Sequence, residues 1–199
     1  MFVQVMEGRV RDREGLKRQL ATWMSDLAPG AHGWLGATAG VTADGVYVAA
    51  VRFESEEAAT ANSERPEQGA WWEETKGAFD GDVTFTNCPE ADTFGAGGSD
   101  DAGFVQMMHG RADRSVVAPA AAEIGDIVRR MRPDVLGGLV AWPGDGTFVQ
   151  VVYFTSEEEA RKAESAEPSP EHRAARERLS ELLTFDRFID LPDPWLYSP

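Results

Sequence analysis

The sequence has few of the residues on which disulfides, metal sites and nucleophilic catalysis depend. It contains one cysteine, Cys88, and three histidines. A single cysteine excludes an intrachain disulfide, and no histidine or cysteine pair has the spacing of a zinc site. No nucleophile elbow is present, and the glycine pairs at 97–98 and 137–138 match neither a P-loop nor a dinucleotide-binding fingerprint. We therefore expect no metal site and no nucleotide cofactor.

Basic residues are also scarce. The chain has 19 Lys and Arg against 34 Asp and Glu, which gives a formal net charge of −15. Positions 1–100 hold 8 basic and 17 acidic residues and the remainder holds 11 and 17, so both halves are acidic. A phosphate-binding surface needs clustered Lys and Arg, and the sequence has no such stripe. We expect neither nucleic acid nor an anionic membrane as a partner, and an acidic surface that favours solubility.

Long apolar runs are missing as well. No segment approaches the roughly 20 apolar residues of a membrane span. The chain opens on a strand-like run, not on a basic segment followed by an apolar one. These features predict a cytoplasmic protein.

What the sequence does contain is a repeat. The segment Phe2–Arg9 (FVQVMEGR) returns about one hundred residues later as Phe104–Arg111 (FVQMMHGR). Gly45–Glu57 returns in the same way as Gly146–Glu158. Because the matching segments keep their order along the chain, the sequence indicates two copies of one domain.

Composition places the boundaries of the copies. Residues 95–103 are rich in Gly, Ser and Asp, as in a flexible linker. The predicted organisation is a first copy at 1–94, a linker at 95–103 and a second copy at 104–199.

Periodicity gives the same order of elements in each copy. Alternating apolar residues predict strands, and a spacing of three and four predicts helices. The expected strands are 2–7, 34–41, 46–53, 83–86, 104–109, 135–142, 147–154 and 185–189. The expected helices are 11–28, 55–79 with a break before Pro66, 115–130, and two that begin at 156 and 169. The apolar stripe of helix 115–130 includes Ile124 and Ile127.

This order is β-α-β-β-α-β, the ferredoxin-like arrangement of a four-stranded antiparallel sheet with two helices on one face. The other face of such a sheet needs a cover. The simplest solution packs the open faces of the two copies against each other. The predicted fold class is α+β, with two tandem ferredoxin-like repeats in a pseudo-dimeric α/β barrel.

With these features the sequence resembles the dimeric α/β-barrel superfamily, in particular antibiotic-biosynthesis-monooxygenase-like (ABM-like) proteins. The resemblance rests on the opening strand Phe2–Val5, the strand Val46–Phe53 with its Glu-rich capped helix, and the run Arg65–Trp72. It covers nearly the whole chain as two fused copies. It implies a ligand cavity between sheet and helices in each copy. Members of this superfamily include cofactor-free oxygenases of polycyclic phenols, haem-degrading enzymes and isomerases, so the resemblance implies no catalytic residue.

Tryptophans are the first ligand-binding candidates. Trp71 and Trp72 lie next to each other on the second expected helix, and Trp23 lies on the apolar stripe of the first. They could stack against an aromatic ligand. The alternative is that one of the adjacent pair packs in the core and the other at a rim, since neighbours on a helix point about 100° apart.

Glutamine and histidine residues on the strands are further candidates. Gln4 and its copy Gln106 alternate with apolar residues, so each could line the barrel as a structural pair or orient a ligand carbonyl. His109 replaces Glu7 at the end of the first strand of the second copy. It could act as a general base on a phenol, ligate haem iron, or lie exposed at the strand end.

The break in the second helix supplies the last candidates. Asn62, Arg65 and Glu67 cluster around it. A helix that restarts there exposes backbone N–H groups that can hold a carboxylate or phenolate, although an ordinary capping corner would look the same. We take His109, Asn62 and Arg65 as the candidate catalytic residues.

Three functions remain open at this point. The leading hypothesis is a cofactor-independent monooxygenase acting on an aromatic or polycyclic small molecule. The second is a non-catalytic small-molecule binding protein, and the third is haem binding. Fusion supplies the interface that single-copy relatives obtain by dimerising, so we expect a monomer with an internal pseudo-two-fold axis or a weak homodimer.

Overall fold

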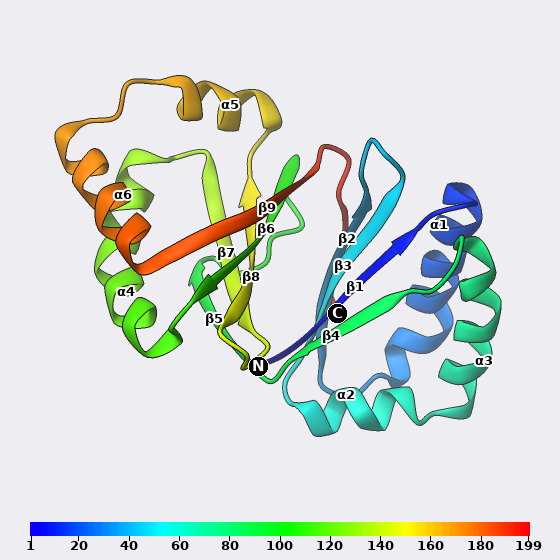
Figure 1. The fold of residues 1–199 in the computed structure, drawn as a ribbon. Helices are drawn as coiled ribbons and strands as arrows, with labels where there is room; N and C mark the ends of the chain where they lie inside the picture. Colours follow the sequence, from blue (N-terminus) through cyan, green and yellow to red (C-terminus); the bar gives the residue numbers. More distant parts are fainter. The chain divides into compact units, whose positions relative to one another are not determined.

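The computed structural model divides the chain into two compact units and describes the side chains of residues 1–120 and 130–199. The first unit comprises Met1–Pro89 and Trp195–Pro199, and the second comprises Glu90–Pro194 (Figure 1). Ile124 and Ile127, expected on a helical stripe, lie outside the described side chains.

The first unit is a five-stranded antiparallel sheet in the order β10-β2-β3-β1-β4, with its helices on one face (Figure 1). Its elements are β1 (Phe2–Arg9), α1 (Arg13–Thr22), η1 (Trp23–Leu27), η2 (Ala28–Gly30), β2 (Trp34–Val41), β3 (Val46–Phe53), α2 (Glu56–Ser63), α3 (Pro66–Thr75), η3 (Lys76–Ala78), β4 (Thr84–Cys88) and β10 (Trp195–Tyr197).

Local sequence signals set the limits of these helices. The Asp12 side chain accepts a hydrogen bond from the Gly15 amide at 2.8 Å and so caps α1. Ser55 caps α2 in the same way through the amide of Ala58. Arg65 has extended backbone dihedrals, as expected before a proline, and α3 restarts with Pro66 in its first turn. The break expected before Pro66 is therefore present.

The first helix differs from its expected extent of 11–28. Regular α-helix ends at Thr22, and a π-helical turn follows at Trp23–Leu27. Trp23 and Leu27, at the two ends of this turn, are both buried. The turn therefore gives Trp23 a fixed place between the helices and the sheet.

The second unit repeats the plan with the sheet order β5-β7-β8-β6-β9. Its elements are β5 (Glu90–Gly95), β6 (Phe104–Ala112), α4 (Arg114–Met131), β7 (Val135–Trp142), β8 (Thr147–Phe154), α5 (Glu157–Ser165), α6 (Pro170–Leu182) and β9 (Leu183–Leu191). The central strands keep the pairing of the first unit, since Phe104 faces Phe154 as Phe2 faces Phe53.

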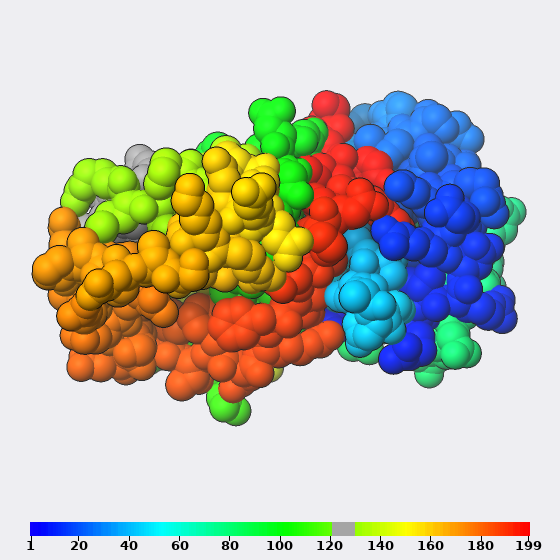
Figure 2. Space-filling model, turned by 90° about the horizontal axis from the view of Figure 1, so that it is seen from above, coloured from blue at the N-terminus to red at the C-terminus, as the bar shows by residue number. Residues whose placement is uncertain are grey.

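Each sheet has a fifth strand that the sequence did not predict. The β5 strand comes at the end of the first predicted copy but pairs with β7 of the second unit. The β10 strand comes at the end of the second predicted copy but pairs with β2, with Trp195 opposite Ala39 and Tyr197 opposite Ala37. The last residues of the chain, red in Figure 2, accordingly lie beside blue segments of the first unit. Strand pairing thus divides the chain differently from the order of the repeats.

The fold is α+β, with two ferredoxin-like copies, as the sequence predicted. Within the described residues, no helix has the length and apolar character needed to cross a membrane.

Candidate functional site

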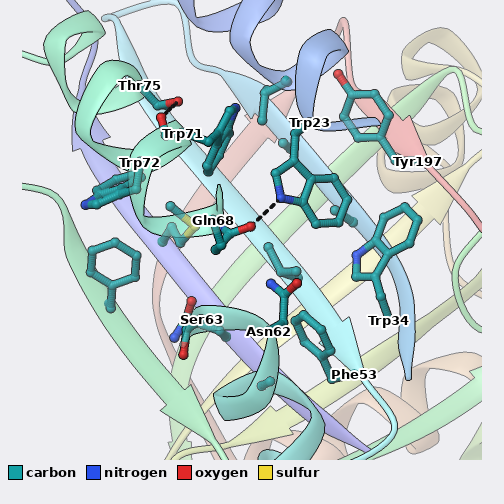
Figure 3. Close-up of a pocket in the computed structure, with 18 of the residues that line it drawn as sticks. Trp23, Trp34, Phe53, Asn62, Ser63, Gln68, Trp71, Trp72, Thr75 and Tyr197 are labelled. Atoms are coloured by element: carbon teal, nitrogen blue, oxygen red, sulfur yellow. Dashed lines mark hydrogen bonds between the residues drawn. The ribbon is translucent and has the colours of Figure 1, made fainter. Parts of the chain in front are cut away.

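The first unit contains a cavity of about 370 Å³ between one face of its sheet and the helices α1, η1, α2 and α3. Figure 3 shows part of its lining, to which strands, helices and the C-terminal strand all contribute. The aromatic members of the lining are Phe2, Trp23, Trp34, Tyr47, Phe53, Trp71, Trp72, Phe79, Phe85 and Tyr197. The polar members are Gln4, Glu56, Thr60, Asn62, Ser63, Gln68, Thr75 and Asn87.

Strand alternation places the floor of the cavity. Phe2, Gln4 and Met6 of β1 all line it, because residues two apart share a face of a strand. Gln4 Nε2 donates a hydrogen bond to Asn87 Oδ1 of the neighbouring strand β4 at 2.9 Å. Gln4 therefore lies in the cavity, with its amide already held by a cross-strand partner.

The aromatic walls come from η1, from α3, from Phe79 just after η3, and from five strands. The rings of Trp23 and Trp34 meet edge-on, with centroids 4.9 Å apart. Trp72 meets Phe85 of β4 in the same geometry at 5.3 Å. Such edge-to-face pairs add stability beyond the area they bury. The walls therefore combine apolar surface with fixed ring positions.

Trp71 and Trp72 both line the cavity although they are neighbours on α3. Trp71 Nε1 donates to the backbone oxygen of Gln19 at 2.8 Å, which ties α3 to α1. Trp71 packs with the cluster around Trp23, whereas Trp72 packs with the cluster around Phe79. The two rings thus line different parts of the cavity.

Arg65 connects the α2–α3 corner to the end of η1. Its Nη1 donates to the backbone oxygen of Leu27 and to Asn62 Oδ1, each at 3.0 Å, and its Nε donates to Glu67 at 2.9 Å. A Cβ on Gly30 would lie 2.7 Å from Arg65 Nη2, so a larger residue there would shift the guanidinium. Arg65 is not itself among the lining residues, and it acts on the cavity by fixing Asn62.

Four polar lining residues, Asn62, Gln68, Tyr47 and Tyr197, are neutral and buried or half-buried. Asn62 is 9% exposed. Trp23 Nε1 donates to Gln68 Oε1 at 2.7 Å. Burial, and then the neighbouring Tyr197, raises the pKa of Tyr47, and burial also raises the pKa of Tyr197. Both phenols therefore stay protonated well above neutral pH.

Charge is almost missing from the lining. Among the described lining residues Glu56, in the first turn of α2, is the one with an ionisable carboxylate, and none is His, Cys, Asp, Lys or Arg. Haem iron in proteins takes a His, Cys, Met or Tyr ligand. The cavity has no histidine or cysteine for that role, and its lining residues of the other two types are Met6, Met24, Tyr47 and Tyr197. No cluster suited to a metal ion occurs among the described residues.

Two of the candidate residues belong to the second unit. Gln106, which is 8% exposed, donates to Asp190 Oδ1 at 2.8 Å, as Gln4 does to Asn87. His109 is half-buried on β6, between Val149 of β8 and Arg187 of β9 in the register of the sheet. The structure thus groups Gln4, Trp23, Asn62, Trp71 and Trp72 around the first-unit cavity and holds Gln106 and His109 elsewhere.

The sequence analysis did not single out several lining residues, among them Glu56, Trp34, Tyr47 and Tyr197. Trp34 begins β2, at a register shift between Trp34 and Gly36. Tyr47 lies on β3, and Tyr197 arrives with the C-terminal strand β10. One signal in the sequence could have pointed to Trp34: the two aligned copies differ there, with Val135 at the equivalent place before the same shift in β7.

Comparison with known proteins identifies the fold. No protein-family model matches the chain, and no curated protein does. Solved structures match over nearly the whole chain. A candidate monooxygenase from Lactobacillus acidophilus has a TM-score of 0.76 at 11% identity, covering 99% of this chain and 95% of its own. A candidate monooxygenase from Fusobacterium nucleatum has a TM-score of 0.72 at 9% identity, covering 99% and 94%.

A third structure, an anthrone oxidase-like protein, has a TM-score of 0.61 at 10% identity and covers 99% of this chain and 90% of its own. At these identities the likeness concerns the fold. The chain therefore has the fold of antibiotic-biosynthesis-monooxygenase-like proteins, as two ferredoxin-like copies fused in one polypeptide.

Proposed function

We propose that the first unit binds an aromatic or polycyclic small molecule in its cavity and oxygenates it with dioxygen, without a bound cofactor. The observation that carries this proposal is the cavity of about 370 Å³ with tryptophans on several sides. That volume is within the range of small-molecule pockets, roughly 300–1,000 Å³. The names of two proteins of similar fold, a candidate monooxygenase and an anthrone oxidase-like protein, point to the same class of substrate chemistry.

The proposed chemistry relies on the substrate as the source of electrons. An activated CH₂ group beside a ring loses a proton to give an enolate, and the enolate reacts with dioxygen. The carbon ends as a carbonyl that holds one oxygen atom, and the second oxygen atom leaves as water with the two hydrogens of the CH₂ group. The protein has to stabilise the enolate oxygen, because hydrogen-bond donors aimed at developing charge lower the barrier.

The neutral donors of the lining fit this task. Asn62 is held through its oxygen by Arg65, which leaves its amide N–H groups for a ligand. Tyr47 is protonated at neutral pH, as tyrosine ordinarily is, and burial raises its pKa further. We assign the proton from the substrate to Glu56, the carboxylate of the described lining. Gln106 and His109 have no part in this proposal, because they belong to the second unit.

The test is oxygen consumption with anthrone and a panel of phenols, followed by mass spectrometry of the product. We expect uptake that scales with protein concentration. The product should gain one oxygen atom and lose two hydrogens, and oxygen-18-labelled dioxygen should label it. Glu56→Gln should lower kcat at least tenfold and leave the Kd of the substrate unchanged. Glu57→Gln removes the same charge from the next residue of α2, outside the lining, and should change neither.

A second candidate is a protein that binds the same ligands without reaction. The small number of ionisable groups in the described lining favours it, since general acid–base catalysis needs a titratable group within reach of the substrate. It predicts saturable quenching of tryptophan fluorescence by phenols and ring ketones, with no oxygen uptake above the rate without protein. That result would reject the oxygenase and retain the ligand site.

A further inference from the structure

One buried donor of the first unit has no protein partner. Trp34 is 6% exposed, and its indole Nε1–H meets no hydrogen-bond acceptor among the described residues. Leaving a buried N–H group without an acceptor is unfavourable, and most such groups in folded proteins are paired. An acceptor that comes from outside the protein would remove this penalty.

The position of this N–H group connects it with the cavity. Trp34 lines the cavity from the start of β2. Its ring is held edge-on against Trp23, with centroids 4.9 Å apart. In Figure 3 the indole nitrogen of Trp34 lies on the side of the ring that faces Trp23 and Asn62. The donor is therefore directed toward this part of the cavity, and because its nitrogen is itself covered, a ligand oxygen reaches it once the surrounding rings shift.

Two neighbouring amides present donors to the same part of the cavity. Asn62 Oδ1 accepts from Arg65 at 3.0 Å, and Gln68 Oε1 accepts from Trp23 Nε1 at 2.7 Å. Because both side-chain oxygens have protein donors, the two amides have their NH₂ groups left for a ligand. Figure 3 shows Gln68, Asn62 and Trp34 reaching into the region next to Trp23.

We propose that Trp34, together with Asn62 and Gln68, forms a subsite for an acceptor oxygen of the ligand. The subsite selects a ring ketone, or the enolate or phenolate derived from it, over a hydrocarbon of the same shape. The inference rests on the proposed function, because it requires that the cavity take an aromatic ligand. It adds which group of the ligand is recognised and which residues recognise it.

The second unit lacks two of these three donors at the equivalent positions and replaces the third. Its β7 strand begins with Val135, which pairs with Phe154 as Trp34 pairs with Phe53. Counting from the capping residues Ser55 and Ser156, the equivalent of Asn62 is Ala163. His172 stands in place of Gln68. The subsite therefore belongs to the first unit and is not a feature of the repeat.

The test compares two probes that differ by one oxygen atom. Both 1-tetralone and tetralin have the same two fused rings, but only 1-tetralone has a carbonyl, and neither has a donor. The full chain is labelled with nitrogen-15 in its tryptophan indoles and titrated with each probe. We expect 1-tetralone to move the indole proton of Trp34 downfield, whereas tetralin leaves it near its starting position. Shifts of Trp71 and Trp72 report binding of either probe.

Substitutions provide the matching affinity measurement. Trp34→Phe should raise the Kd of 1-tetralone about fivefold to tenfold, which corresponds to one hydrogen bond to a buried donor. It should change the Kd of tetralin less than about twofold. Trp195→Phe is the control. Trp195 is 4% exposed and its Nε1 also has no acceptor among the described residues, but it does not line the cavity. This control should bind both probes as the wild type does.

The outcomes separate this inference from the proposed function. Suppose that 1-tetralone binds but leaves the Trp34 resonance unmoved, as it would if the face of Trp23 or a water molecule already satisfied the N–H group. The subsite is then wrong while the ligand cavity stands. Binding of neither probe would overturn both. If Trp34→Phe does not fold, benzothienylalanine at position 34 removes the N–H group with almost no change in shape. We then expect this variant to show the same loss of affinity for 1-tetralone and the same small change for tetralin.

Discussion

Gly36 shows how a single residue controls the shape of the cavity wall. Its φ of +118° lies in the region that favours glycine. A Cβ at this position would lie 2.4 Å from Arg52 Nη2 and 2.5 Å from the backbone oxygen of Tyr197. The glycine therefore permits the register shift after Trp34 and admits the C-terminal strand at the edge of the sheet.

Replacing Gly36 with alanine should release that strand. We expect Gly36→Ala to lower the free energy of unfolding of the first unit by about 2–3 kcal/mol, from backbone strain and the contact with Tyr197. Gly45→Ala is the matched control, because Gly45 also has a positive φ of +83° but a Cβ there meets nothing within 4 Å. It should lose about 1 kcal/mol. Urea unfolding gives both values.

Hydrogen exchange of the last residues distinguishes strain from displacement. Amides of Trp195–Tyr197 should lose protection in Gly36→Ala and keep it in Gly45→Ala. Equal stability losses with unchanged protection in both variants would show that Gly36 matters only for its own dihedral angles.

At the scale of elements, periodicity predicted the four strands and the helices of each copy and missed the fifth strand of each sheet. Apolar alternation gave β1, β3 and β8, and serine caps gave the starts of α2 and α5. The strands β5 and β10 escaped because they are short, carry Asp, Glu or flanking Pro, and pair with β7 and β2, which lie far away in the sequence. Such pairing is set by tertiary contacts that local propensity does not contain.

The β5 strand is anchored by a carboxylate with several donors. Arg114 donates to Asp92 through Nε at 3.0 Å and Nη2 at 2.9 Å, and Trp142 Nε1 donates to it at 2.9 Å. The hydrogen bonds from Arg114, with a smaller contribution from Trp142, hold the pKa of Asp92 below its usual value although burial opposes this. The charged form of Asp92 is thus the stabilising one.

This anchor predicts a pH dependence. A carboxylate whose folded pKa is lowered stabilises the protein above its unfolded pKa, near 3.9 for Asp. That stabilisation is lost as the pH falls through the folded value. Asp92→Asn should therefore destabilise the second unit by about 1–2 kcal/mol at pH 7, allowing for the partial exposure of the pair. The difference from wild type should shrink toward zero below about pH 3.

Asp186→Asn serves as the control for this measurement. Asp186 pairs with Arg111 at 2.9 Å on the exposed strand β9, and exposed pairs contribute about 0–1 kcal/mol. Urea unfolding of both variants at several pH values makes the comparison. If Asp92→Asn costs no more than Asp186→Asn, or if its cost does not change with pH, the carboxylate is not the anchor of β5.

At the scale of the whole molecule, the two copies share a fold and differ in their polar groups. The sequence predicted the duplication, and it supplied five residues that lie around the first-unit cavity: Gln4, Trp23, Asn62, Trp71 and Trp72. Their roles stay predictions. It did not predict that Tyr197 completes the wall, because that depends on the pairing of β10 with β2. The sequence thus indicated which side chains could bind a ligand, but not which strands would bring them together.

One difference between the copies suggests why the cavity residues of the first copy are neutral. In the second unit Gln106 bonds to Asp190, and Arg161 pairs with Asp190 while its guanidinium lies 5.1 Å from the Phe104 ring. The equivalents in the first unit are Gln4, Asn87, Thr60 and Phe2, all of which line the cavity. The second unit thus has an ion pair where the equivalent residues of the first unit are uncharged and line the cavity.

Transferring that ion pair should close the first-unit cavity. We expect the double variant Thr60→Arg, Asn87→Asp to bind 1-tetralone at least about tenfold more weakly, because the guanidinium would cover Phe2 and resist the loss of its water. Stability should change by less than about 1 kcal/mol, since the same partly exposed pair is accommodated by the same framework in the second unit. Ala61→Lys adds a positive charge to the exposed side of α2 and should leave binding unchanged. Fluorescence titration measures the affinity of the wild type and of both variants for 1-tetralone. Wild-type affinity in the folded double variant would show that ligands do not use this cavity.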